Sequence, residues 1–251
     1  MTTKAFRKDI AALADAKGRK KQKAFVVEGT KCVLDNLGCF KLKHLIATPQ
    51  WLNSHNFSEN IVEANRGEIG EMSSMTLAPD VMAVYELPDD IEFDVNGIEN
   101  QLVLCLDRIQ DPGNFGTIVR LADWMGVTTI LASNDTVDCF NPKAIQATMG
   151  AIARVKIIYG FLPDILSKLP KEMPVYGTFL NGENIYKATL SHQGIVIMGN
   201  EGRGISEEVA KFVNRRLLIP SYPPDRPTSE SLNVATATAI TLSQFRSRLM
   251  K

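Results

Sequence analysis

The chain has 251 residues, of which 45% are hydrophobic and 22% charged. This composition excludes a disordered tail, a collagen-like repeat and a disulfide-bonded miniprotein. Lys plus Arg and Asp plus Glu each total 28, so the net charge alone favours no class of partner. The length suits one large domain or two smaller ones, and we expect two.

Positive charge is concentrated near the N-terminus. Between Met1 and Lys31 nine basic residues stand against three acidic ones, a net of +6, which leaves −6 for the rest of the chain. A basic arm on an otherwise acidic chain attracts polyanions, so nucleic acid is the leading candidate partner. An ordinary solvated helix face is the alternative for the charge run by itself.

The cysteines and histidines predict no metal site, because no C-x-x-C pair occurs and the three histidines are scattered. We expect reduced thiols and a cytoplasmic location. The N-terminus lacks the apolar core of a signal peptide, and no apolar run approaches the ~20 residues of a membrane helix. We therefore expect neither a membrane nor a metal as partner.

The first 90 or so residues alternate short helical and strand patterns, which predict a small α/β domain. Residues 87–100 have the polar, breaker-rich composition of a linker, so we place the domains at 1–95 and 96–251. The elements predicted in the first domain are helices at 6–16 and 30–37, with an apolar run at 24–27 between them, and strands at 42–47, 61–64 and 81–85.

From residue 101 onward strands alternate with helices, which predicts a mostly parallel sheet with helices on both faces. Ligands bind such sheets at the carboxyl ends of the strands. Asn141 followed by Pro142 marks the start of one helix. The predicted strands are 102–106, 127–131, 155–158, 175–179, 195–198 and 217–219; the helices are 114–125, 141–149, one after Ser206, and 231–249.

Polar residues follow the first predicted strand of this second domain, in the stretch from Asp107 to Arg120. Asn114 is the expected N-cap of the next helix, which puts Arg120 in the second helical turn. An arginine there reaches an anion held near the helix N-terminus. A well-capped helix with a surface arginine is the simpler alternative.

A glycine-rich turn, G-N-E-G-R-G from Gly199 to Gly204, follows a buried strand. Its glycines are not in the order G-x-G-x-x-G of the dinucleotide fingerprint, which argues against a standard nicotinamide site. Three glycines still suit close approach by a cofactor, and Glu201 either caps backbone amides or contacts a ligand. A plain turn is the alternative.

A proline-rich loop leads into the third segment, S-L-N-V from Ser231 to Val234, which opens the last helix. Ser231 and Asn233 place polar side chains beside the N-terminus of that helix. Simple capping of the helix by Ser231 is the alternative to a functional role.

Together these segments resemble the SpoU (TrmH-like) RNA 2′-O-ribose methyltransferases of the SPOUT superfamily. The resemblance is carried by N-x-G-x-x-x-R from Asn114 to Arg120, by G-N-E-G-x-G from Gly199 and by S-L-N-V from Ser231, in the family's order. It covers residues 101–250. More loosely, F-V-V-E-G-T-K at 25–31 resembles the ribosomal-protein-like substrate-binding domain that often precedes the methyltransferase domain.

The resemblance implies an α/β parallel sheet with helices on both faces and a C-terminal trefoil knot, preceded by a small α/β ribosomal-protein-like substrate-binding domain. It also implies a homodimer formed through the knot region and S-adenosylmethionine as cofactor. Backbone amides and apolar side chains would hold the adenine. By motif matching, the cofactor-binding residues are Thr178, Leu180, Gly199, Ile219 and Leu232.

The implied reaction moves a methyl group to a ribose 2′-hydroxyl, and the family assigns activation of that hydroxyl to the arginine matching Arg120. Because a guanidinium essentially never loses its proton, we interpret Arg120 as a phosphate clamp that orients the hydroxyl. The proton acceptor stays open. Asn114 and Glu201 would position Arg120 or the ribose, and Ser231 and Asn233 would shape the loop and contact the substrate.

One departure from the family is the loop at 221–230, which is longer than the family's short glycine-containing stretch and holds Pro223, Pro224 and Pro227. By analogy we prefer ribosomal RNA over transfer RNA as substrate. A decayed RNA-binding protein and a Rossmann-like nucleotide enzyme of another class remain alternatives. The basic residues expected to contact RNA are Arg19, Lys20, Lys21, Lys23 and Lys31.

Overall fold

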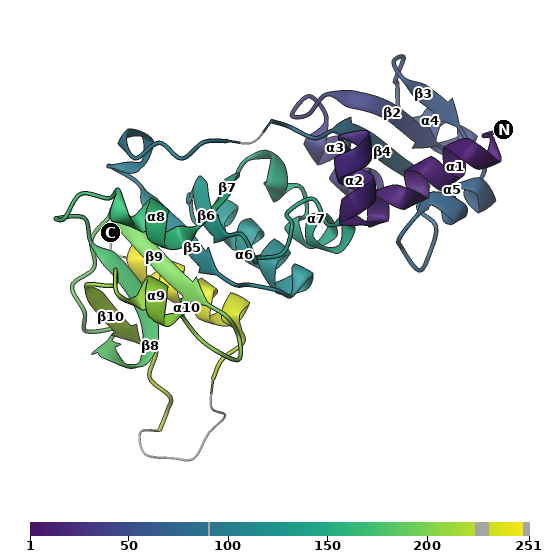
Figure 1. Ribbon diagram of the computed structural model, residues 1–251. Coiled ribbons are helices and arrows are strands. Elements are labelled where there is room, and N and C mark those ends of the chain that lie inside the picture. The colour runs from purple at the N-terminus through teal and green to yellow at the C-terminus, as the bar shows by residue number, and fades with distance from the viewer. Residues whose placement is uncertain (90, 224–230, 248–251) are drawn as a thin grey trace. The chain divides into compact units, whose positions relative to one another are not determined.

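The computed structural model describes residues 1–89, 91–223 and 231–247. The chain divides into two compact units (Figure 1). The first holds Met1–Asp89 and Asp138–Ala153, and the second holds Asp90–Val137 and Arg154–Lys251. The division after Asp89 falls in the predicted linker, but the segment Asp138–Ala153 packs with the first unit although the sequence had placed it in the second domain.

The first unit is built on a mixed four-stranded sheet with the strand order β1-β4-β2-β3. Strand β4 is antiparallel to both β1 and β2, and β2 is parallel to β3. The three predicted strands are confirmed, and the apolar run at 24–27 forms the fourth strand. Their bounds are β1 Ala24–Glu28, β2 Leu42–Ala47, β3 Ile61–Glu63 and β4 Val81–Glu86.

Helices cover both faces of this sheet, and each face has its own apolar core. The helix predicted at 6–16 is interrupted by a 3₁₀ turn, so that prediction is wrong in its length. Helices α4 and α5 were not predicted, because six or seven residues show too little periodicity. The elements are α1 Lys4–Ala11, η1 Ala12–Ala14, α2 Ala16–Gln22, α3 Thr30–Asn36, α4 Pro49–Ser54, α5 Arg66–Met72, α7 Pro142–Thr148 and η3 Ala151–Ala153.

Helix α7 belongs to the core of the first unit although it is encoded between two strands of the second. Ile145 of α7 lies in one buried cluster with Phe25 and Tyr85. Phe140, just before α7, packs on Phe25 with ring centroids 4.5 Å apart. The predicted start of this helix is confirmed, because the Asn141 side chain caps it and Pro142 is its first residue.

The second unit is built on a six-stranded parallel sheet with the strand order β10-β8-β9-β5-β6-β7. This confirms the predicted α/β class, because every adjacent pair in the sheet is parallel. The strands are β5 Leu102–Asp107, β6 Thr129–Ser133, β7 Lys156–Gly160, β8 Val175–Asn184, β9 Gly194–Gly199 and β10 Arg215–Leu218.

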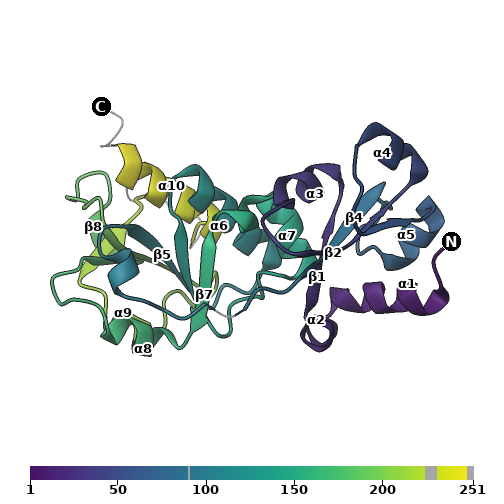
Figure 2. The same ribbon diagram turned by 90° about the horizontal axis from the view of Figure 1, so that it is seen from above.

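Helices lie on both faces of the parallel sheet, as Figure 2 shows. Helices α8 and α9 cover one face, where Cys105 is fully buried and burial raises the pKa of its thiol. Helices α6 and α10 cover the other face, and Phe245 of α10 meets Tyr176 edge to face at 4.9 Å. The elements are η2 Asn96–Ile98, α6 Pro112–Trp124, α8 Leu162–Ser167, α9 Glu207–Ala210 and α10 Val234–Ser247.

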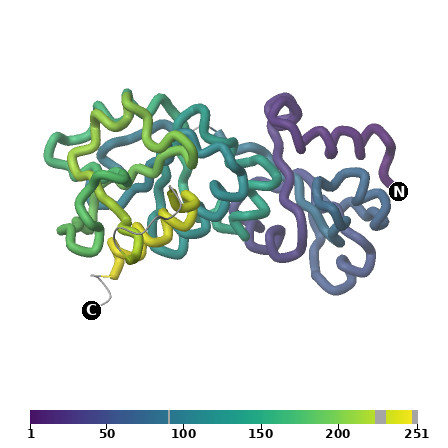
Figure 3. Tube along the Cα trace, turned by 90° about the horizontal axis from the view of Figure 1, so that it is seen from below, coloured from purple at the N-terminus to yellow at the C-terminus, as the bar shows by residue number. Residues whose placement is uncertain are grey.

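The predicted trefoil knot depends on the path of the chain from β10 to α10, the yellow helix in Figure 3. That path includes residues 224–230, which are most of the proline-rich loop and lie outside the described residues. The knot therefore stays a prediction.

Candidate active site

The first predicted segment lies where β5 ends and α6 begins. Asp111 caps α6, since its Oδ1 accepts a hydrogen bond of 2.7 Å from the backbone N–H of Asn114, and Pro112 is the first helical residue. The prediction that Asn114 is the N-cap is therefore wrong. Asp111 takes that role because it stands directly before a proline that is pre-organised for the first helical position. The Asn114 side chain is left available for other contacts.

Arg120 consequently lies further along α6 than predicted. Counted from Pro112 it is the ninth helical residue, in the third turn instead of the second. Six residues separate it from Asn114, a rise of about 9 Å along the axis. Its side chain is exposed, and among the described residues no hydrogen bond or ion pair holds it. Helical side chains lean toward the N-terminus of their helix, which for α6 is the end at the carboxyl edge of the sheet.

The glycine-rich turn folds back on itself directly after β9. Asn200 and Gly204 form an isolated antiparallel bridge. A Cβ on Gly199 would lie 2.3 Å from the backbone of Gly204, so only glycine permits this close approach. The turn directs Glu201 to α6, where Asn114 Nδ2 donates a hydrogen bond of 2.9 Å to Glu201 Oε1.

The third segment joins the same group of side chains. Asn233 Nδ2 donates a hydrogen bond of 2.9 Å to Asn114 Oδ1. Asn233 Oδ1 accepts from the N–H groups of Ala235 and Thr236 and so caps α10. Capping by Ser231 is therefore wrong, and the structure shows Ser231 exposed. A continuous chain of hydrogen bonds, Asn233–Asn114–Glu201, links segments that are far apart in the sequence.

Sequence reasoning missed the residues that brace the glycine-rich turn against β5. The buried Asp107 accepts a hydrogen bond of 2.6 Å from the backbone N–H of Ser206. Asn200 Nδ2 donates to the carbonyl of Arg108 at 2.8 Å. The available signal was an acidic residue at the end of a wholly apolar strand, since a buried charge requires hydrogen-bond partners.

Of the predicted cofactor residues, Thr178 and Leu180 lie within β8, Gly199 ends β9, Ile219 follows β10 and Leu232 precedes α10. The register of β10 on β8 jumps from Gly177 to Glu183, so the intervening residues form an excursion in which Leu180 is 79% exposed. Thr178 Oγ1 lies 4.0 Å from Met198 Sδ on β9, next to Gly199. Ile219 directly follows β10 and is half-buried. Leu232, which is 46% exposed, directly precedes Asn233.

The predicted basic RNA-contacting set divides in the structure of the first unit. Lys20, Lys21 and Lys23 are exposed on and just after α2. Arg19 is only 3% exposed and pairs with Asp138 at 2.6 Å, so it is not available to RNA and its inclusion was wrong. Its position in a basic run concealed this structural role.

Lys31, the last member of the predicted basic set, lies apart from the others in α3. Its side chain is exposed and forms an ion pair of 2.7 Å with Asp35 one helical turn later. An exposed pair of this kind is weak, so an RNA phosphate can replace the carboxylate. Lys31 therefore stays in the predicted set.

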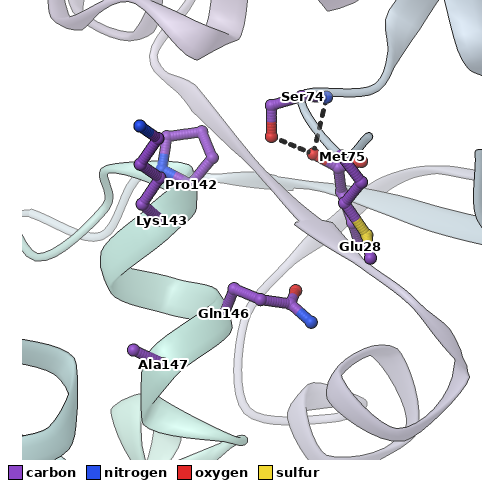
Figure 4. Close-up of a pocket in the computed structure, with 7 residues that line it drawn as sticks. All are labelled: Glu28, Ser74, Met75, Pro142, Lys143, Gln146 and Ala147. Carbon is purple, nitrogen blue, oxygen red and sulfur yellow. Dashed lines mark hydrogen bonds between the residues drawn. The ribbon is translucent and has the colours of Figure 1, made fainter. Parts of the chain in front are cut away.

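A pocket of about 290 Å³ lies in the first unit, between α7 and the chain that follows α5 (Figure 4). Its buried Glu28 accepts hydrogen bonds from the hydroxyls of Ser73 and Ser74 and from the backbone N–H of Ser74. In Figure 4 the amide of Gln146 points from α7 into the space beside Glu28. No predicted catalytic or cofactor residue lines this pocket, so we place the candidate active site at the sheet edge of the second unit.

Within 1–89, 91–223 and 231–247, no group of His, Cys, Asp or Glu side chains suits a metal ion. None of the described helices has the length and hydropathy that a membrane span requires.

The arrangement defines the class of protein: a parallel α/β domain whose polar site is assembled from three segments at the carboxyl edge of the sheet. The chain belongs to the SpoU rRNA Methylase family, whose family model matches residues 101–243. The model of the MRM3-like substrate binding domain matches residues 6–83.

Individual relatives agree with this assignment. The 23S rRNA (guanosine(2553)-2'-O)-methyltransferase RlmP of Bacillus subtilis is 35% identical over 146 residues, which are 57% of this chain and 57% of that protein. A solved structure of a TrmH-family protein from Porphyromonas gingivalis is 38% identical, with a TM-score of 0.89 and 99% of each chain covered. The AdoMet-bound rRNA methyltransferase of Sinorhizobium meliloti is 28% identical, with a TM-score of 0.84 over 100% of this chain and 98% of that one.

Proposed function

We propose that this protein is an S-adenosylmethionine-dependent RNA methyltransferase that acts on a ribose 2′-hydroxyl of structured ribosomal RNA. One observation carries the proposal: the hydrogen-bonded chain Asn233–Asn114–Glu201 unites the three family segments at the carboxyl edge of a parallel sheet. The names of the relatives, which include a 23S rRNA 2'-O-methyltransferase, support the substrate and the reaction.

The residues around this edge fit the proposed cofactor. Leu180 and Leu232 expose apolar side chains there, and the half-buried Thr178 and Gly199 lie on neighbouring strands. Apolar walls with a few convergent polar groups are what an adenine nucleoside requires. We assign Thr178, Leu180, Gly199, Ile219 and Leu232 to this site. When bound, S-adenosylmethionine supplies the methyl group.

The chain's own polar residues bind and orient the acceptor. Asn114 is fixed from both sides, so its amide holds the Glu201 carboxylate in one position. Arg120 is exposed and permanently charged, and in the proposal it clamps the RNA phosphate and aligns the ribose hydroxyl. Asn233 fixes the start of α10, and Ser231 is exposed beside it to contact the substrate.

The first unit supplies RNA affinity in this proposal. Lys20, Lys21, Lys23 and Lys31 are exposed, so each can neutralise a phosphate and release counterions. Folded RNA with accessible bases suits a separate binding unit better than a free nucleotide does.

The proposed assembly is a homodimer through the knot region. Leu180 in β8, Tyr222 after β10 and Leu232 before α10 expose apolar side chains, which a partner subunit would cover. Light scattering after size-exclusion chromatography measures the mass. A monomer at micromolar concentration would refute this part of the proposal.

The deciding experiment transfers labelled methyl from S-adenosylmethionine to unmodified 16S, 23S and transfer RNA transcripts. The wild type and Arg120→Ala are compared, and nuclease mapping locates the label. We expect label on a ribose of ribosomal RNA and its loss in the variant. Label on transfer RNA alone would change the substrate to tRNA.

Cofactor titration separates this proposal from a decayed RNA-binding protein. The methyltransferase binds S-adenosylmethionine, whereas a decayed protein binds RNA without it. The continuous Asn233–Asn114–Glu201 chain favours the enzyme, because a decayed site has no need to retain it.

A further inference from the structure

Arg108, at the carboxyl end of β5, has an unusual backbone conformation. Its φ of 61° lies in the left-handed region, which is unfavourable for an arginine and favours glycine. Its N–H donates a hydrogen bond of 2.8 Å to Ser133 Oγ, and its carbonyl accepts one of 2.8 Å from Asn200 Nδ2. The neighbouring strand ends therefore hold Arg108 in this conformation. Such strain persists where the surroundings impose it, often at functional sites.

The Arg108 side chain is incompletely satisfied. It is 26% exposed, and its Nε is buried without a hydrogen-bond acceptor among the described residues. The carboxylate of Asp107 is the paired acid, but its Oδ1 lies 3.5 Å from Nε while Oδ2 accepts from Ser206. A partly buried guanidinium with unused donors is costly unless a ligand accepts from it.

The position of Arg108 ties it to the candidate active site. Asn200, whose side chain donates to the Arg108 carbonyl, directly precedes Glu201 in the chain. Asn114, which donates to Glu201, lies six positions after Arg108. The glycine-rich turn and Arg108 are thus parts of one braced structure at the carboxyl edge of β5 and β9. A ligand that reaches Glu201 comes close to this strand end.

We propose that Arg108 binds an oxyanion of a bound substrate, a second anion contact beside that of Arg120. This rests on the proposed function. A planar guanidinium matches phosphate and carboxylate groups in bidentate geometry. Two substrates carry such a group: the RNA, as a backbone phosphate, and S-adenosylmethionine, as its carboxylate. The alternative role is neutralisation of Asp107 alone.

Arg108→Lys separates these roles. Lysine keeps a positive charge beside Asp107 and makes the same demand on the backbone, but it lacks Nε and the planar fork. Arg215→Lys, at an exposed arginine of edge strand β10, is the matched control. We expect both variants to melt as the wild type does. If Arg108 binds an RNA phosphate, its lysine variant binds an unmodified 23S rRNA transcript about tenfold more weakly in filter binding, with S-adenosylmethionine affinity unchanged.

A second arm tests the cofactor carboxylate. If Arg108 binds it, Arg108→Lys weakens S-adenosylmethionine binding about tenfold but leaves decarboxylated S-adenosylmethionine unaffected. The proposal is overturned if the variant binds both ligands like the wild type, or if Arg215→Lys has the same effect. Both arms measure binding and not turnover, so a wild type that transfers no methyl would refute the proposed function without deciding the role of Arg108.

Discussion

Arg19 offers a direct test of the structural assignment against the prediction from the basic run. Its guanidinium donates two hydrogen bonds to Asp138 Oδ2, at 2.6 and 3.0 Å. It donates two more to the carbonyls of Leu13 and Ala14, at 2.9 and 2.8 Å. Arg19→Ala removes all four and leaves the Leu13 carbonyl without this donor in a buried position.

The cost of this substitution follows from those contacts. Hydrogen bonds to charged groups contribute about 1.5–3 kcal/mol each, but Asp138 is 42% exposed, so solvent replaces much of that pair. We expect a loss of about 3 kcal/mol, at the low end for removing one partner of a buried pair. At about 2–4 °C per kcal/mol for a chain of this size, Tm falls by about 6–12 °C.

Thermal unfolding and salt-dependent RNA binding are measured together, with Lys21→Ala as the control on the same helix. Lys21 is exposed, so its alanine variant keeps the wild-type Tm and lowers the slope of log Kd against log salt by about 1. Arg19→Ala should show the opposite pattern. A wild-type Tm combined with a reduced salt slope would refute the structural role and restore Arg19 as an RNA contact.

Three further predictions concern the site and the fold. Asn114→Ala removes the amide that joins the three segments, so kcat should fall roughly 10²-fold while calorimetry shows unchanged cofactor affinity. A wild-type single-turnover rate in this variant would contradict the positioning role of Asn114. Gly199→Ala places a Cβ 2.3 Å from backbone, so calorimetry should show S-adenosylmethionine binding lost, whereas Gly202→Ala, 3.8 Å from its nearest neighbour, should bind normally. Equal binding by both glycine variants would contradict this reading of the turn. Hydrogen bonds from the backbone N–H of Asn65, the larger cause, and from the backbone N–H of Thr2 lower the pKa of Glu68 from 4.5 to about 2. The stability that this carboxylate contributes is therefore present above its unfolded pKa and lost as pH falls toward 2. Urea unfolding from pH 5 to pH 2 should show a smaller loss of unfolding free energy in Glu68→Gln than in the wild type. Identical pH profiles for the two proteins would contradict the role of Glu68.

Much of the fold was predictable because apolar runs and turn residues carry local information. The strand at Leu42–Ala47 was predicted at its observed bounds, and the cap at Asn141 was identified from the following proline. Three motifs in order at successive strand ends also indicated the family. Their weakness as single patterns did not matter, because the sheet brings them to one edge.

The remaining features depend on contacts between distant residues. Asp111 and Asn114 are both good N-caps, and only the three-dimensional structure decides between them. Arg19 stands among exposed lysines, and no local sequence pattern indicates that it pairs with Asp138, 119 residues later. Asn233 takes the cap of α10 from Ser231 while it also reaches Asn114. Such side chains serve two segments at once, which no local pattern encodes.

The return of Asp138–Ala153 to the first unit has a consequence for synthesis on the ribosome. Phe25 is translated early, but Phe140 and Ile145, which pack in the same cluster, are translated more than 100 residues later. The core on this face of the first sheet therefore cannot close until β5, α6 and β6 have emerged. Most multidomain chains complete their first domain before the second begins. Here the nascent chain must keep an open apolar surface while it starts its second sheet, so a gene truncated at the linker would encode a permanently unfinished core.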